Sequence, residues 1–511
     1  MAYFALMKSC LRWLLVGMLH LMNADHLAAQ SILIKNGVVY DGSIDHKPSK
    51  QDILINDAGQ IVKIKKHLKS KQSRIIDAAG KIVTPGFIDT HAHGDPIAAP
   101  EFKNFIAMGV TSIVLGQDGD GPMYQDLSSW YTEVMKARPG VNIAVLGGHG
   151  TLRFLTGVKF KRVPDSLEIH KMVSQLEDWM RAGSFGMSTG LEYVPGTYAQ
   201  AAELLALAKV VGQYDGILMS HMRNEDDEAL ESSINELLDQ GRYCKVHIAH
   251  FKDVYGKGVE RAEQLLQLIE RHPNAMQLSA DLYPYTASYT GIGIVFPSWA
   301  LAPVDYDSIR LTRRSELLDY VTAKVNKRNG PEATLFGTGK YAGKSLAEVA
   351  LAQYKPFAEI LVDEIGPEGA SGAYFVMNEE LQQRLLQSSK VMVCSDGSPG
   401  MRHPRGYGTF AKIIEEFVFK RKAISLQEAI YKMTGLSART LGLKDRGFLK
   451  PGFVADLLIF DPTKVKANAN YENPYQLASG FDLVMINGRI AKEGDMISEV
   501  RYGRVLKKNQ D

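Results

Sequence analysis

Short apolar runs alternate with helical stretches through the middle of the chain. Stretches with apolar spacing near 3.6 residues, such as SLEIHKMVSQLEDWMRAG, predict amphipathic helices. Eight runs between such stretches are short and rich in Val, Ile, Leu or Met, as buried strands are. These eight are IVTPGFID (82–89), VTSIVL (110–115), NIAVLG (142–147), SFGMST (184–189), ILMS (217–220), KVHIA (245–249), QLSAD (277–281) and VMVCS (391–395). The alternation predicts an α/β fold, a (β/α)8 TIM-type barrel over residues 85–444.

A different pattern occupies both ends of the chain. Residues 30–84 and 445–511 contain short β-rich runs broken by Asn, Asp and Gly, among them SILIKNGVVYDG and ADLLIFDP. We therefore expect a small β-sandwich domain built from both chain ends. The gap between the seventh and eighth strands is too long for one crossover. It predicts an inserted lid subdomain at about 287–385, where a substrate would be covered.

The first 29 residues have the pattern of a signal peptide. Lys8 and Arg12 precede the apolar run LLVGMLHLM, and small residues at 28 and 29 fit cleavage before Gln30. The run is too short for a comfortable membrane span, although an uncleaved N-terminal anchor is the alternative. The sequence thus predicts an exported protein, periplasmic or extracellular, with no integral membrane segment after signal cleavage.

Composition excludes several classes of partner and scaffold. Of the 511 residues, 45% are hydrophobic and 23% are charged, the mix of an ordinary globular protein. The net charge of +2 gives no basic field for a nucleic acid. Three cysteines are too few for a disulfide framework or a thiolate zinc cluster, and we expect Cys244 and Cys394 to be buried free thiols. The sequence makes no prediction of oligomeric state.

Polar residues follow most of the expected strands, at positions that line the C-terminal face of a barrel. They include His91, His93, Asp118, His221, His250, Lys252, Tyr283, Asp396 and Arg405. The imidazoles of a His-X-His pair at a strand end point the same way, because side chains repeat every two residues. Imidazoles and carboxylates are ligands that zinc accepts. The sequence therefore predicts a metal site at this face.

Several motifs also resemble those of a known family. PGFIDTHAHGDP, the late Asp396 and the closing ADLLIFDP resemble the amidohydrolase superfamily. GHGTLR, FGMSTGLEYVPGTYA, SHMRNE, DLYPYTA, HPRGYGTF and MTGLSA, in this order over roughly 35–490, resemble the N-acyl-D-amino-acid deacylase (D-aminoacylase) family. The resemblance implies a metal-bearing barrel with a small β-sandwich. It also implies a hydrolase that cleaves the amide bond of N-acyl-D-amino acids, small-molecule substrates with a free carboxylate.

The resemblance implies one or two divalent ions, Zn²⁺ by preference. His91, His93 and Asp396 would hold one, and His221 and His250 the other. The family commonly has Asn-Cys-Gly where this chain has Gln117-Asp118-Gly119. A carboxylate can ligate zinc as a thiolate does, so Asp118 is the bridging candidate, with Asp120 and Glu192 as weaker alternatives. If Asp118 only caps a turn, a one-metal site remains.

The remaining roles follow from the same resemblance. Asp396 would act as general base and then general acid, while Lys252, Tyr283 and Arg405 would bind the substrate carboxylate. Two alternatives stay open. One is another amidohydrolase reaction, such as that of a dipeptidase or a cyclic-amide hydrolase. The other is an exported, non-catalytic relative that binds a metal or a ligand.

Overall fold

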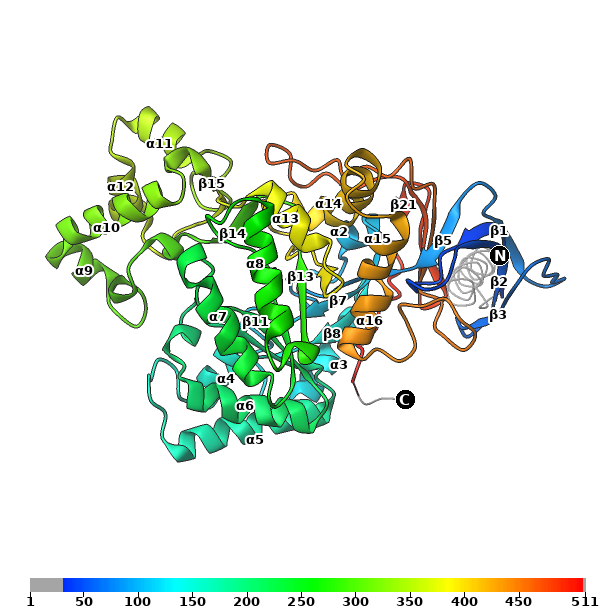
Figure 1. The fold of residues 1–511 in the computed structure, drawn as a ribbon, viewed down its shortest axis with the longest axis horizontal. Helices are drawn as coiled ribbons and strands as arrows, with labels where there is room; N and C mark the ends of the chain where they lie inside the picture. The colour runs from blue at the N-terminus through cyan, green and yellow to red at the C-terminus, as the bar shows by residue number, and fades with distance from the viewer. Residues whose placement is uncertain (1–30, 509–511) are drawn as a thin grey trace, which may run out of the picture.

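The computed structural model describes residues 31–508. Figure 1 shows a central body of strands and helices, with a sheet built from both chain ends on one side. A segment that contains α9 to α12 projects from the opposite side. Within the described residues, no helix has the length and apolar character needed to cross a membrane. The expected signal peptide at 1–29 lies outside these residues.

The central body is the expected barrel of parallel strands. Its strands are β6 (Phe87–Asp89), β7 (Val110–Leu115), β8 (Asn142–Val145), β9 (Gly147–Gly148), β10 (Gly186–Gly190), β11 (Ile217–His221), β12 (Lys245–Ile248), β13 (Leu278–Leu282) and β17 (Val391–Val393). β8 and β9 are successive parts of one staggered strand, so eight strands are present. The barrel closes where Ala92 bridges Gly397 and the Asp396 amide donates to the His91 carbonyl at 2.8 Å.

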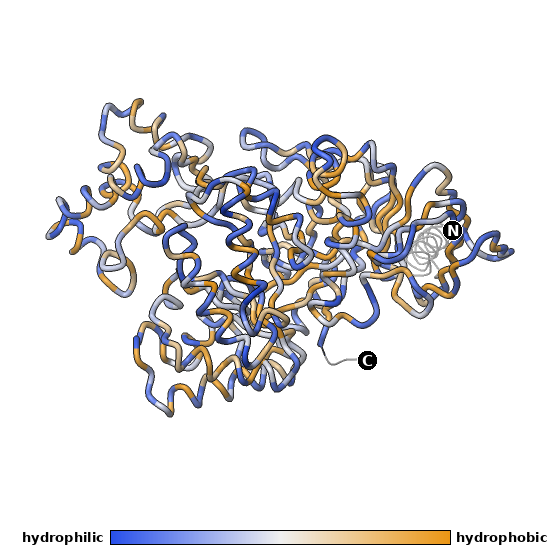
Figure 2. The backbone as a smooth tube through the Cα atoms, in the orientation of Figure 1, coloured by the Kyte–Doolittle hydropathy of each residue, from blue (hydrophilic) through white to orange (hydrophobic). Residues whose placement is uncertain are grey.

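Helices cover the outside of this barrel. They are α2 (Lys103–Ala107), α3 (Leu127–Ala137), α4 (His149–Leu155), α5 (Ser166–Ala182), α6 (Ala201–Gln213), α7 (Asp227–Gln240), α8 (Gly258–Arg271), α13 (Glu379–Leu386), α14 (Arg405–Lys412), the π-helix η7 (Ile413–Lys420), α15 (Leu426–Met433) and α16 (Gly435–Leu441). Short 3₁₀ turns are η1 (Gly196–Tyr198) and η2 (Ala275–Gln277). Hydrophilic and hydrophobic positions alternate along these helices (Figure 2), as packing on a core by one face requires.

The first expected strand is wrong in its extent. Residues 82–89 form two strands, β5 (Ile82–Pro85) and β6, which belong to different sheets. The strand is interrupted at Gly86, which packs so closely on Thr111 that a Cβ atom would lie 2.2 Å from Thr111 Oγ1. Pro85 also has no amide hydrogen to donate to a ladder. Hydrophobicity alone does not show where one strand ends and the next begins when both lie in a single apolar run.

The other sheet joins the two ends of the chain. It contains β1 (Ile32–Val39), β2 (Ser49–Ile55), β3 (Ile61–Lys65), β4 (Arg74–Asp77), β5, β18 (Leu457–Phe460), β19 (Phe481–Ile486), β20 (Arg489–Glu493) and β21 (Met496–Ile497). β5 pairs antiparallel with β18, with Val83 opposite Ile459. One set of its side chains forms a separate core, and another packs into the barrel core. All nine strands belong to one hydrogen-bonded sheet, and its division into a sandwich stays a prediction.

The segment between β13 and α13 has a core of its own, which includes Val321, Phe336, Leu361 and Tyr374. Its antiparallel sheet has the order β14-β16-β15. The elements are β14 (Ala287–Gly291), η3 (Ile292–Val295), η4 (Ser298–Ala300), α9 (Tyr306–Thr312), α10 (Arg314–Lys327), η5 (Pro331–Ala333), β15 (Thr334–Phe336), α11 (Leu346–Gln353), α12 (Phe357–Glu359), the π-helix η6 (Ile360–Ile365) and β16 (Ser371–Phe375). α13 packs against α8 and is a barrel helix.

Candidate functional site

A cavity of about 500 Å³ opens at the C-terminal ends of the barrel strands. Eight of the nine expected site residues line it, and these are His93, Asp118, His221, His250, Lys252, Tyr283, Asp396 and Arg405. The ninth, His91, is completely buried and contacts the lining residues from below. The structure therefore brings together side chains that follow six different strands.

The backbone at three of these residues has an uncommon conformation. Asp118, His250 and Asp396 have φ values of 54°, 38° and 47°. Residues other than glycine rarely adopt positive φ, and such strain is concentrated at functional sites. The Asp118 loop also depends on close approach by β10, because a Cβ atom on Gly190 would lie 2.0 Å from the Asp118 carbonyl oxygen. Each strand thus ends in a turn that directs its polar side chain into the cavity.

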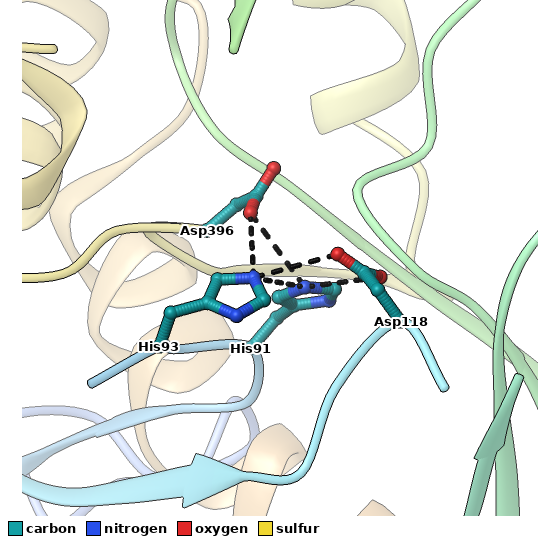
Figure 3. A group of neighbouring side chains, drawn as sticks. All are labelled: His91, His93, Asp118 and Asp396. Carbon is teal, nitrogen blue, oxygen red and sulfur yellow. Dashed lines mark hydrogen bonds and ion pairs between the residues drawn. The ribbon is translucent and has the colours of Figure 1, made fainter. Parts of the chain in front are cut away.

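His91, His93, Asp118 and Asp396 form a first group of converging ligand atoms (Figure 3). His91 Nε2 and His93 Nε2 are 3.3 Å apart, and each lies 3.4 Å from an oxygen of Asp118. Asp396 Oδ1 is 3.2 Å from His93 Nε2 and 3.6 Å from His91 Nε2. Tetrahedral zinc bonds of about 2.0–2.1 Å separate neighbouring ligand atoms by about 3.3 Å. The four side chains therefore fit one divalent ion.

Asp118 also belongs to a second group, with His221 and His250. Asp118 Oδ1 is 3.3 Å from His250 Nε2 and 4.0 Å from His221 Nδ1. The two imidazole nitrogens are 3.0 Å apart. Three protein ligands leave room for a water or a substrate, which is typical of catalytic rather than structural metal sites. Asp118 thus belongs to both groups, and its role as a bridging ligand stays a prediction.

Glu192 and Glu225 surround His221 in a third group of potential ligands. Glu192 Oε2 lies 3.0 Å from His221 Nε2, on the side of the ring away from Asp118. Glu225 Oε1 lies 3.3 Å from His250 Nδ1. Carboxylates on the outer nitrogen of a ligand histidine fix its tautomer and orientation. Glu192 and Glu225 are placed to do this for the second group.

Asp281, at the end of β13, supports the floor of the site. Its Oδ1 accepts a hydrogen bond from the His250 amide at 2.6 Å. Its Oδ2 accepts one from Thr90 Oγ1 at 2.5 Å and pairs with His247 Nε2 at 3.0 Å. Burial opposes ionisation of Asp281, but His247 outweighs it and lowers the pKa of the carboxyl. His247, which the sequence left without a role, is therefore a core partner of this carboxylate.

The carboxylates of the first group are held in their charged form. Burial alone would raise the pKa of Asp396, but Arg405 and His93 hold it well below its usual range. Burial would also lower the pKa of His93, and the Asp118 and Asp396 carboxylates instead raise it to about 9. Burial outweighs the same carboxylates at His91 and lowers the pKa of that imidazole. His93 thus attracts a cation strongly, whether a proton or a metal, and the two compete for the same position.

The three residues expected to bind a substrate carboxylate differ in their partners. Arg405 Nη1 pairs with Asp396 Oδ2 at 2.8 Å, and its guanidinium lies 4.6 Å over the Tyr283 ring. Tyr283 Oη is buried and has no hydrogen-bond partner among the described residues. Lys252 Nζ lies 2.6 Å from Glu225 and 2.8 Å from His250 Nδ1. Lys252 therefore contacts the ligand residues directly, which the sequence did not indicate.

Two other sequence observations have clear structural outcomes. Cys244 and Cys394 are buried free thiols, as expected. Gln117, beside the shared Asp118, is buried and donates from its amide to the Thr90 carbonyl at 2.8 Å. It anchors the loop and supplies no ligand atom to the groups described above.

The sequence placed Glu225 after the fifth expected strand but gave it no role, and it assigned nothing to Asp281. Glu225 follows β11 four residues after His221, so its place in SHMRNE was a usable signal. Asp281 had a weaker one, a carboxylate inside an otherwise apolar strand end (QLSAD). Buried charges in such positions are paired or functional.

Comparison with known proteins agrees with the resemblance found in the sequence. A model of the Amidohydrolase family matches residues 345–491. N-acyl-D-glutamate deacylase of Alcaligenes xylosoxydans xylosoxydans is 32% identical, over 85% of this chain and 88% of that protein. D-aminoacylase of the same organism is 30% identical, over 93% and 97%.

Solved structures give the same result. N-acyl-D-glutamate deacylase from Bordetella bronchiseptica, complexed with zinc and a phosphonate mimic of the tetrahedral intermediate, matches with a TM-score of 0.81 at 28% identity. The match covers 94% of this chain and 99% of that one. A D-aminoacylase structure from work on its binuclear metal centre matches with a TM-score of 0.79 at 30% identity, over 93% and 99%. The chain therefore belongs to the N-acyl-D-amino-acid deacylase (D-aminoacylase) family of amidohydrolases.

Proposed function

We propose that this chain is a metal-dependent hydrolase that cleaves the amide bond of N-acyl-D-amino acids, releasing a carboxylate and a free D-amino acid. One observation carries the proposal: two groups of ligand atoms share Asp118 in a cavity that also contains the Arg405 guanidinium. Relatives named N-acyl-D-glutamate deacylase, N-acyl-D-aspartate deacylase and D-aminoacylase support the substrate class and its configuration.

The residues that would hold Zn²⁺ are those of the two groups. His91, His93, Asp118 and Asp396 would hold one ion, and Asp118, His221 and His250 a second. A bound divalent metal supplies Lewis-acid chemistry, since it polarises a carbonyl and lowers the pKa of a coordinated water to about 7. The protein fixes the ligand positions through Glu192, Glu225 and the Asp281 network.

Asp396 is the proton carrier in this proposal. Its low pKa keeps it ionised at neutral pH, so it can accept the proton from the attacking water. As the C–N bond breaks, the same carboxyl delivers that proton to the departing nitrogen. Arg405 keeps Asp396 oriented through Oδ2, which leaves Oδ1 directed at the ligand group.

A substrate carboxylate would bind at the Arg405 end of the cavity. The guanidinium has five N–H donors, so it can hold Asp396 and a carboxylate together. Tyr283 Oη offers a further, unengaged donor beside it. Lys252 would contribute only by sharing its ammonium with Glu225. This arrangement supports a requirement for a negatively charged group on the substrate.

The test is hydrolysis of enantiomeric N-acetyl amino acids by protein reconstituted with Zn²⁺, with metal content measured on the same sample. We expect turnover of the D-enantiomers and its loss on chelation. Asp396→Asn should keep the fold, by circular dichroism, and lose turnover. Near-wild-type activity in this variant would contradict the proposed role of Asp396 as proton carrier. Preferential hydrolysis of dipeptides or hydantoins would instead indicate a dipeptidase or a cyclic-amide hydrolase.

We also propose that the chain is exported, on the pattern of its first 29 residues alone. Expression with those residues intact, followed by N-terminal sequencing of the exported fraction, tests this. A mature end near Gln30 is expected, and an exported protein that begins at Met1 would contradict cleavage.

A further inference from the structure

Arg328 is a second buried arginine on the wall of the substrate cavity. It is the residue after α10 in the inserted segment, is 3% exposed, and lines the same cavity as Asp118 and Arg405. The mechanism proposed above does not use it. Its position means that the inserted segment contributes a cationic group to a site otherwise built by the barrel.

The surroundings of Arg328 leave its charge without a carboxylate. Among the described residues, no carboxylate oxygen lies within 4.0 Å of its guanidinium nitrogens. Asp226, an acidic side chain on the cavity wall, is already paired with Lys324 Nζ at 3.3 Å and Lys327 Nζ at 3.2 Å. Arg328 Nε is buried with no hydrogen-bond partner, and the guanidinium rests 4.8 Å from the Tyr374 ring centre.

Each of the other buried arginines in the described part of the chain is paired with a carboxylate. Arg153 is paired with Glu203 at 2.7 Å, Arg405 with Asp396 at 2.8 Å, and Arg446 with Asp456. Arginine does not lose its proton in proteins. A buried guanidinium without an anion is therefore costly, and it is stabilised by any anion that reaches it.

A second unengaged donor lies on the same wall. Ser288 on β14 is directly opposite Tyr374 on β16, so the two side chains share one face of the small sheet. Ser288 Oγ is buried, lines the cavity, and has no hydrogen-bond partner among the described residues. Ser288 and Arg328 are thus both neighbours of Tyr374, and each has a buried donor without a hydrogen-bond partner.

We propose that Arg328, assisted by Ser288, is a second anion-binding position that selects N-acyl amino acids carrying a second carboxylate. The inference rests on the proposed function, because it assigns the α-carboxylate to the Arg405 end of the cavity. The second carboxylate can belong to the amino-acid side chain or to the acyl group. Either way it gains charge-assisted hydrogen bonds, which are strong where solvent is excluded.

Kinetics with matched substrate pairs test this position. N-acetyl-D-glutamate is compared with N-acetyl-D-glutamine, and N-succinyl-D-alanine with N-butyryl-D-alanine. The wild-type kcat/KM should favour the dianionic member of at least one pair, and the favoured pair identifies where the carboxylate sits. Arg328→Gln should lower that preference about 10- to 100-fold, and Arg328→Lys should restore part of it. Arg314→Gln, on the same helix but paired with Asp363 at the surface, should leave the preference unchanged.

Binding of products separates this inference from the proposed function. D-glutamate and D-glutamine are not hydrolysed, so calorimetry on the zinc-loaded protein measures their affinities without turnover. Tighter binding of D-glutamate that is lost in Arg328→Gln supports the position on the side-chain arm, even if no N-acyl substrate is cleaved. Equal preference for neutral and dianionic ligands in wild type, in both assays, overturns it. So does a preference that survives in a folded Arg328→Gln protein.

Discussion

At the residue scale, the shared Asp118 is the most informative feature of the site. Its two oxygens face different imidazoles of the first group, and Oδ1 also faces His250 of the second. A carboxylate at this position is a harder donor than a thiolate and offers two oxygens in place of one sulfur. We therefore expect the metal preference of this chain to depend strongly on this one side chain.

Asp118→Asn should remove the charge that holds both ligand groups together. We expect the zinc content of the purified protein to fall, and kcat/KM to fall about 10- to 100-fold or more, as for lost metal-site partners. Elemental analysis and steady-state kinetics on one preparation measure this. Asp120→Asn is the matched control, because Asp120 lies on the same loop and lines the same cavity outside the ligand groups. Equal metal content in the two variants would show that Asp118 does not ligate.

Arg405→Lys should affect binding of the substrate carboxylate more than chemistry. Lysine keeps a positive charge beside Asp396 but loses the planar pair of donors. KM for an N-acyl-D-amino acid should rise about 10-fold or more, and much less for the corresponding C-terminal amide. Michaelis–Menten analysis of acid and amide side by side provides the comparison. The clamp is excluded if the two substrates are affected equally.

Residues that follow strands could be identified from sequence because the ends of barrel strands meet at one face. His91, Asp118 and His250 are examples, and each is adjacent to a recognisable apolar run. Arg328 could not be identified this way, because it belongs to the inserted segment and reaches the cavity only through tertiary packing. The ion pair between Lys252 and Glu225 could not be predicted either, because a sequence does not show which side chains lie close together.

At the element scale, the inserted segment is held together by its own core and by a cluster of charges. Glu364 of η6 accepts hydrogen bonds from Lys340 at 2.7 Å, Lys355 at 2.9 Å and Tyr341 at 2.6 Å. These contacts join the loop after β15, the residues just after α11, and η6. The cluster thus helps to fix the body from which Arg328 and Ser288 reach the cavity.

Glu364→Gln should destabilise the segment in a pH-dependent way. Its lysine and tyrosine partners lower the pKa of Glu364 to about 2, against about 4.5 in an unfolded chain. The cluster therefore stabilises the protein fully above pH 4.5, and this contribution is lost as the pH falls toward 2.

Urea unfolding at pH 6 and at pH 3 measures the difference between wild type and this variant. We expect about 1 kcal/mol at pH 6, because the pairs are close to the surface and screened, and less at pH 3. Glu359→Gln in the same segment is the control. A difference that grows on acidification would contradict the assigned role of the cluster.

Element prediction succeeded where an apolar run serves a single sheet. The run at 110–115 forms β7 with the expected bounds, and the expected helix SLEIHKMVSQLEDWMRAG forms α5 between Asp165 and Gly183. It failed at 82–89, where one run feeds two sheets. The inner architecture of the insertion was not predictable either, because its short helices have no strong periodicity and depend on a small local core.

At the scale of the whole molecule, the candidate metal ligands come from widely separated parts of the chain. They follow β6, β7, β11, β12 and β17, so a bound metal joins most of the circumference of the barrel. Anything that binds only the folded protein stabilises it, by about 4 kcal/mol at a concentration 1,000 times its dissociation constant.

Removal of the metal should therefore lower the melting temperature by several degrees. Calorimetry before and after chelation, with zinc returned as the reversal, measures the change. Hydrogen exchange should increase at the strand ends around the cavity and not in the sheet formed by the chain ends. A melting temperature that is unaffected by chelation, in protein whose zinc loss is verified, would contradict the assigned ligands.

The pairing of β5 with β18 also has a consequence for biosynthesis. β18 leaves the ribosome about 370 residues after β5, a delay of roughly 20–75 s at about 5–20 residues per second. During that interval β5 can pair with β1 on one side, but the edge that β18 covers stays open. Open edges of this kind promote aggregation. Nascent chains of this protein should therefore need protection by a chaperone until translation is nearly complete.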